Sequence, residues 1–86
     1  MNDAAHLAQM ANDIGNFFRG QTSREDAVAG IANHISSFWT RRMQDKLLAQ
    51  IEAGGVSIDE LPREAMRRIA ETRSLETKQR SGGTEG

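Results

Sequence analysis

The chain has 86 residues, no cysteine, and a formal net charge of −1 from 11 Lys plus Arg against 12 Asp plus Glu. This length suffices for one small domain that buries only about 60% of its unfolded surface, so a partner surface would add stability. The lack of cysteine excludes disulfides, iron–sulfur ligation, thiolate zinc sites and thiol nucleophiles. The balanced charge excludes a general attraction to nucleic acid or to an anionic membrane.

The sequence also lacks the signals of secretion and of membrane insertion. Residues 1–6 have neither the positive segment nor the apolar run of a signal peptide. The longest apolar stretches fall far short of the roughly 20 residues that span a bilayer. We therefore expect a soluble protein in the cytoplasm.

A first helix is predicted from apolar residues that recur at three- and four-residue steps, because this spacing places their side chains on one helical face. These residues are Ala4, Leu7, Met10, Ala11, Ile14, Phe17 and Phe18. Gly20 follows and predicts the end of the helix, since a residue without a Cβ adopts the left-handed conformation at low cost.

A second helix is predicted to begin after Ser23, whose hydroxyl can accept from a free backbone N–H of the first turn. Its apolar face comprises Val28, Ile31, Ala32, Ile35, Phe38 and Trp39.

If this helix continued, Arg42 would fall in the centre of the apolar face, where an unpaired guanidinium is costly to bury. We therefore break the helix near Thr40, which is a competent N-cap for a third helix. That helix buries Met43, Leu47, Leu48 and Ile51 and ends at Gly54-Gly55.

A fourth helix is predicted from the capping-box spacing of Ser57 and Glu60, with Pro62 in the first turn, where proline is tolerated. We expect it to run to about Arg73 and, because its apolar side is thin, to lie against the other helices. Residues 74–86 are polar apart from Leu75 and cannot bury enough surface to offset the cost of ordering. The expected organisation is one helical domain, 1–73, and a flexible, disordered polar tail, 74–86.

The predicted fold class is therefore all-α, a small domain of three to four helices built on an antiparallel helical hairpin. The two helices of that hairpin share the pattern [MI]-A-N-x-I-x-x-F-[FW], at residues 10–18 and 31–39. Two core helices with similar apolar faces would show such a likeness, and so would a duplicated hairpin.

No motif for catalysis or for cofactor binding is visible. His6 and His34 lie on separate helices without a nearby carboxylate cluster, which does not make a metal site of three or four ligands. There is no Gly-rich phosphate loop after a strand, no nucleophile elbow and no His-Glu-x-x-His. We expect no cofactor and no metal in this chain.

Four arginines on the fourth helix raise the alternative of a nucleic-acid-binding module: Arg63, Arg67, Arg68 and Arg73. Glutamates 60, 64 and 71 are interleaved with them at spacings that allow i,i+4 pairing. This pattern favours a solvated face of ion pairs over a nucleic-acid-binding or membrane-binding surface.

The candidate partner-binding residues surround the junction of the second and third helices. They are Phe38, Trp39, Arg41, Arg42 and Met43. Trp, Arg and Met are enriched in the centres of protein interfaces because they combine apolar area with adaptable polar reach. The alternative is that the two aromatic residues close the helical core.

The same segments carry a family resemblance. Met-Ala-Asn-Asp-Ile-Gly-Asn-Phe-Phe at 10–18, Gly-Ile-Ala-Asn-His-Ile at 30–35 and Phe-Trp-Thr-Arg-Arg-Met at 38–43 resemble the delta subunit of NAD-dependent formate dehydrogenase. The resemblance covers roughly Leu7 to Ala70. The chain departs from the family pattern at Arg41, where that pattern has proline, so Thr40 alone fixes the start of the third helix.

The resemblance implies a non-catalytic accessory subunit of a cytoplasmic complex that oxidises formate and reduces NAD. The molybdenum or tungsten bis-pyranopterin cofactor, the iron–sulfur clusters and the FMN are then implied to belong to larger subunits, which this chain would stabilise or help to assemble. The alternatives are a small helical regulator or nucleic-acid-binding module, and a helical bundle that associates with itself when isolated.

Overall fold

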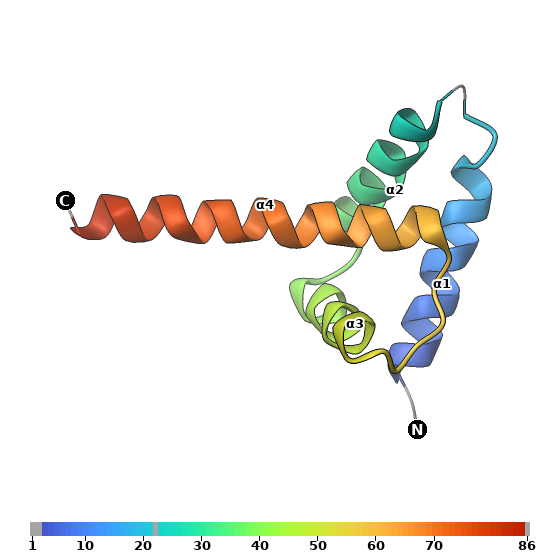
Figure 1. The fold of residues 1–86 in the computed structure, drawn as a ribbon, viewed down its shortest axis with the longest axis horizontal. Helices are drawn as coiled ribbons and strands as arrows, with labels where there is room; N and C mark the ends of the chain where they lie inside the picture. Colours follow the sequence, from blue (N-terminus) through green and yellow to red (C-terminus); the bar gives the residue numbers. More distant parts are fainter. Residues whose placement is uncertain (1–2, 22, 86) are drawn as a thin grey trace.

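The computed structural model describes the backbone of residues 3–21 and 23–85 and the side chains as far as residue 76. The described residues form four helices and no strand, which confirms the predicted all-α class (Figure 1). The helices are α1 (Asp3–Phe18), α2 (Arg24–Phe38), α3 (Arg41–Ala53) and α4 (Glu60–Glu85).

The arrangement starts from an antiparallel hairpin of α1 and α2, which a short turn joins at one end of the molecule (Figure 1). Helix α4 crosses this hairpin and contacts each of the other three helices, α2 most extensively. The C-terminal half of α4 extends beyond the other helices, as Figure 1 shows. The expected hairpin is therefore present, and α4 is the element that ties the bundle together.

The hydrophobic core draws side chains from all four helices and from the segment before α4. Ile31, Ile35 and Leu47 have no exposed surface, and neither has Met66 of α4. The remaining members of the cluster are Leu7, Ala8, Ala11, Val28, Trp39, Ile58, Ala65 and Ile69. Although the apolar side of α4 is thin, Ala65, Met66 and Ile69 all lie in the core, because α4 crosses the bundle instead of lying on its edge.

The predicted helix boundaries around α2 and α3 are confirmed. The Ser23 hydroxyl accepts a hydrogen bond from the backbone N–H of Asp26 at 3.0 Å, and α2 begins at Arg24, directly after Ser23. The Thr40 hydroxyl accepts from the N–H of Met43 at 3.1 Å and caps α3. Gly54 ends α3 in the left-handed conformation, with φ of 75°.

The prediction for Gly20 is wrong in its mechanism. Helix α1 ends at Phe18, close to the expected position, but Gly20 does not adopt the left-handed conformation. A turn closes the helix instead, in which the backbone N–H of Gln21 donates to the carbonyl of Phe18 at 3.0 Å. Because this hydrogen bond satisfies a terminal carbonyl, the helix end needs no residue with positive φ.

Helix α4 begins two residues later than the Ser57 capping box predicts. Its first helical hydrogen bond runs from the N–H of Arg63 to the carbonyl of Asp59 at 3.0 Å. The side-chain oxygen of Asn12 in α1 accepts from the N–H of Asp59 at 2.8 Å. This interaction between distant residues holds the start of the helix in place of a local cap. Pro62 lies in the first turn, as predicted.

Helix α4 continues to Glu85, beyond the expected end at Arg73. The sequence has neither glycine nor proline between residues 74 and 80, and its Leu, Glu, Lys and Gln have high helix propensity, so nothing there ends the helix. The division of the chain at residue 73 and the flexibility of the tail stay predictions. The side chains of residues 77–86 lie outside the described part.

Candidate protein-interaction surfaces

Trp39 forms a rigid corner between α2 and α3. Its side chain is only 6% exposed and belongs to the hydrophobic core. Its backbone N–H donates to the carbonyl of Ile35 at 2.9 Å, and its carbonyl accepts from the buried side chain of Gln44 at 3.2 Å. Trp39 therefore shapes the corner from within and does not offer its ring to solvent.

The five candidate partner-binding residues do not share one surface. Phe38 is 74% exposed, on the side of α2 that carries His34. Arg41 lines a groove between α2 and α4. Arg42 and Met43 line a separate pocket with residues of α1, among them Leu7. The corner thus distributes its exposed side chains over three faces of the molecule, with Trp39 buried between them.

An aromatic surface spans α1 and α2 and consists of Phe17, Phe18, His34 and Phe38. The ring centroids of Phe17 and Phe18 are 5.2 Å apart, those of Phe18 and His34 are 6.5 Å apart, and those of His34 and Phe38 are 4.7 Å apart. Phe17 and Phe38, the outer members, are 78% and 74% exposed. Exposed aromatic rings in such a row are typical of a surface that another protein covers.

Sequence reasoning missed this surface, although its signal was present. It assigned Phe17 to the buried face of the first helix, whereas Phe17 is the most exposed large hydrophobic side chain among the described residues. The residues equivalent to Phe17 and Phe18 in the repeated pattern are Phe38 and Trp39. Adjacent residues of a helix point in different directions, and in both pairs the first ring, Phe17 or Phe38, is the one that is exposed.

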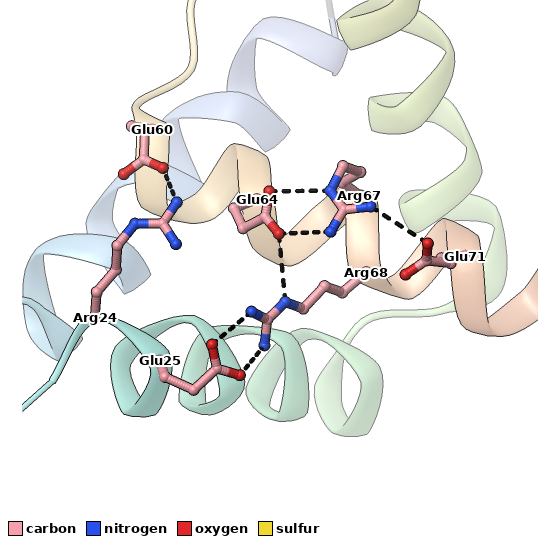
Figure 2. Close-up of polar contacts among 7 residues, drawn as sticks. All are labelled: Arg24, Glu25, Glu60, Glu64, Arg67, Arg68 and Glu71. Carbon is pink, nitrogen blue, oxygen red and sulfur yellow. Dashed lines mark hydrogen bonds and ion pairs between the residues drawn. The ribbon is translucent and has the colours of Figure 1, made fainter.

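A network of ion pairs connects α4 with the start of α2 (Figure 2). Arg68 binds both carboxylate oxygens of Glu25 with its two terminal nitrogens, at 2.6 and 2.7 Å. Arg24 pairs with Glu60 beside it. These pairs lower the pKa of Glu25, mainly through the hydrogen bond from Arg68, and raise the pKa of Arg24.

Glu64 is the centre of the network on α4 itself (Figure 2). It accepts from Arg67 at 2.7 and 3.0 Å and from Arg68 at 3.4 Å, while Arg67 also reaches Glu71 at 3.4 Å. The hydrogen bond from Arg67 is the largest cause that lowers the pKa of Glu64 to about 2. Arg73 pairs with Asp45 of α3. The arginine-rich helix therefore carries the ion-paired face that its spacing favours over a nucleic-acid-binding surface.

Two open grooves flank α4. The α2–α4 groove has a volume of about 650 Å³ and is lined by small residues of α2, by Arg41 and Gln44 of α3, and on α4 by Arg68, Ile69, Thr72, Arg73 and Glu76. The α3–α4 groove has a volume of about 400 Å³, with a floor of Leu48, Ile51 and Met66 below charged side chains. Both grooves are wide open to solvent.

Within the described residues, no three His, Cys, Asp or Glu side chains gather in a way that could hold a metal ion. In the same part of the chain, no helix combines the length and the apolar character needed to cross a membrane. His6 and His34, the two histidines, lie on α1 and α2, and His34 packs against Phe38.

The fold and these surfaces define a small all-helical protein whose distinctive features are an exposed aromatic surface and two open grooves. Residues 6–66 match the family described as "NADH-dependant formate dehydrogenase delta subunit FdsD". The match covers more than half of the 86 residues, and the chain belongs to this family. Comparisons with curated proteins and with solved structures gave no match.

Proposed function

We propose that this chain is a non-catalytic accessory subunit of a cytoplasmic NAD-dependent formate dehydrogenase complex. It binds the larger subunits and stabilises the molybdenum- or tungsten-containing one or assists its assembly. The observation that carries this proposal is the family match over residues 6–66. All four residues of the aromatic surface lie inside the matched range, so the match includes a surface suited to binding another protein.

The chemistry of formate oxidation is assigned to the partner subunits. This chain has no cysteine for an iron–sulfur cluster, and its described residues do not gather ligands for a metal. These residues therefore do not fit a bis-pyranopterin metal or an iron–sulfur cluster. We assign these two groups and the flavin to the larger subunits.

The aromatic surface is the proposed main contact with the larger subunits. Phe17 and Phe38 expose most of their rings, and burying large aromatic side chains supplies much of the binding energy of protein interfaces. Trp39 fixes the corner behind Phe38, and Arg41, Arg42 and Met43 extend the contact on the neighbouring faces. The buried Trp39 thus acts by holding the surface in shape.

The test is a pull-down from cells that co-express the tagged chain with the larger formate dehydrogenase subunits. Replacing Phe17 and Phe38 together by Ala removes the exposed rings and leaves the core untouched, so we expect the larger subunits to be lost from the eluate. Leu75→Ala is the matched control, because Leu75 is 58% exposed on α4, away from this surface. Full recovery of the larger subunits with the double variant would refute this contact.

A further inference from the structure

The repeated pattern relates two positions of α1 to two positions of α2 by an offset of 21 residues: Asn12 corresponds to Asn33, and Gly15 to Ser36. On α1, Asn12 accepts from the backbone N–H of Asp59, and a Cβ added to Gly15 would lie 2.9 Å from Pro62 Cδ. This face of α1 therefore holds the start of α4, where Asp59, the residue before the helix, and Glu60, its first residue, carry carboxylates.

The equivalent face of α2 is not covered in the same way. Asn33 and Ser36 line the α2–α4 groove of about 650 Å³. Asn33 is exposed, and its side chain makes no hydrogen bond with the described residues. Asn33 of α2 is thus equivalent to Asn12 of α1, but it faces an open groove, whereas Asn12 holds the start of a helix.

Three arginines line this groove, and Arg41 is the one of them that has no acidic partner among the described residues. Arg73 uses one terminal nitrogen to pair with Asp45, while its other terminal nitrogen, Nη1, is buried without an acceptor among the described residues. Arg68 also lines the groove but is already paired with Glu25 and Glu64, and Glu76 is the acidic residue among the described lining residues. Unsatisfied guanidinium donors bind carboxylates well.

We propose that the α2–α4 groove binds an acidic, helix-initiating segment of a partner protein. The side chain of Asn33 accepts a backbone N–H of that segment, as Asn12 does from Asp59, and Arg41 binds a carboxylate of its first turn. Carboxylates are common in the first turn of a helix because they interact favourably with its positive end. This inference rests on the proposed function, since it supposes that the chain has a protein partner.

The test uses the full isolated chain and a peptide with the sequence of residues 57–62, acetylated and amidated at its ends, because that segment occupies the equivalent face of α1. In NMR titrations we expect saturable shifts of the backbone amides of Asn33, Ser36 and Arg41. A peptide with Asp59→Asn and Glu60→Gln should not produce them. Arg41→Glu should weaken binding about tenfold or more, which corresponds to the loss of one charge-assisted hydrogen bond.

The matched control for the protein is Arg19→Glu, because Arg19 is exposed and lines a different pocket. It should bind the acidic peptide as the unchanged chain does. Equal shifts with the neutral peptide, or shifts that lie outside the groove, would overturn this proposal. If the peptide test fails while the larger subunits still co-purify with the chain, only the proposed role of the groove is rejected. If the peptide binds as expected while the larger subunits do not co-purify, the proposal of a formate dehydrogenase partner is rejected.

Discussion

The side-chain oxygen of Asn12 accepts the backbone N–H of Asp59 at 2.8 Å, which joins α1 to the start of α4 across 47 residues of sequence. The N–H groups at a helix start have no partner within the helix, and a residue just before the helix normally caps them. Here a side chain from another helix holds the residue that precedes α4. The orientation of α4 on the bundle therefore depends on a contact between distant residues.

The first prediction concerns this hydrogen bond. Asn12→Ala removes the acceptor and should lower the free energy of unfolding by about 1 kcal/mol, the usual net value of one such bond. Asn33→Ala is the matched control, because Asn33 has the equivalent position on α2 and makes no hydrogen bond in the described part of the isolated chain. Urea denaturation followed by circular dichroism measures both. Equal effects of the two substitutions would contradict this role of Asn12.

The second prediction concerns the close approach of α1 and α4. A Cβ at Gly15 would lie 2.9 Å from Pro62 Cδ, and the proline ring cannot rotate away because it is fixed to the backbone. Overpacking of this kind costs about 1–3 kcal/mol, against about 1 kcal/mol gained by alanine inside a helix. Gly15→Ala should therefore lower the melting temperature.

The control for Gly15 is Gly20→Ala. A Cβ at Gly20 has nothing within 4 Å, and Gly20 does not need positive φ, so the melting temperature should change little. A rise in melting temperature for Gly15→Ala would show that α4 does not pack as closely on α1 as described.

The third prediction separates the two adjacent aromatic residues of the corner. Trp39→Ala empties a site in the core and should destabilise the chain by about 3–5 kcal/mol, enough to unfold a domain of this size. Phe38→Ala removes a ring that is already 74% exposed and should change stability by less than about 0.5 kcal/mol. Thermal unfolding of both variants checks this contrast, and comparable losses would place Phe38 in the core as well.

The fourth prediction concerns pH. The hydrogen bond from Arg67 lowers the pKa of Glu64 from 4.5 to about 2 in the folded chain. A lowered folded-state pKa means that Glu64 contributes stability above its unfolded pKa and that this contribution is lost as the pH falls towards 2. Unfolding measured between about pH 5 and pH 2 should thus show a shallower loss of stability for Glu64→Gln than for the unchanged chain.

Arg67→Gln removes the hydrogen-bond donor that is the largest cause of the lowered pKa of Glu64, so it should also make the loss of stability with falling pH shallower. High salt should weaken the effect of Glu64, since exposed pairs are screened. Identical pH profiles for Glu64→Gln and the unchanged chain would contradict the role given to the network.

Local signals in the sequence predicted the helix starts that depend on neighbouring residues. Ser23 and Thr40 both cap as expected, and the cost of burying Arg42 correctly placed the break between α2 and α3. The same reasoning failed where a distant residue decides. Ser57 has capping-box spacing, yet Asn12 holds the chain two residues later and α4 begins at Glu60.

The surfaces were harder to predict than the helices. The apolar face of a predicted helix shows which side chains can be buried. The angle at which the helices cross then decides which residues at the edge of that face remain exposed. Phe17 lies on such an edge and points to solvent, whereas Trp39, the last residue of the second copy of the pattern, is buried. The pair between Arg68 and Glu25 joins residues 43 positions apart, which spacing within one helix cannot reveal.

Whether this chain is an accessory subunit can be tested by purification through a tag on it, from cells that also make the larger formate dehydrogenase subunits. We expect those subunits to co-elute and the eluate to reduce NAD with formate, whereas the chain purified alone should not oxidise formate. Elution of the chain by itself from such cells, or formate oxidation by the isolated chain, would contradict this accessory role.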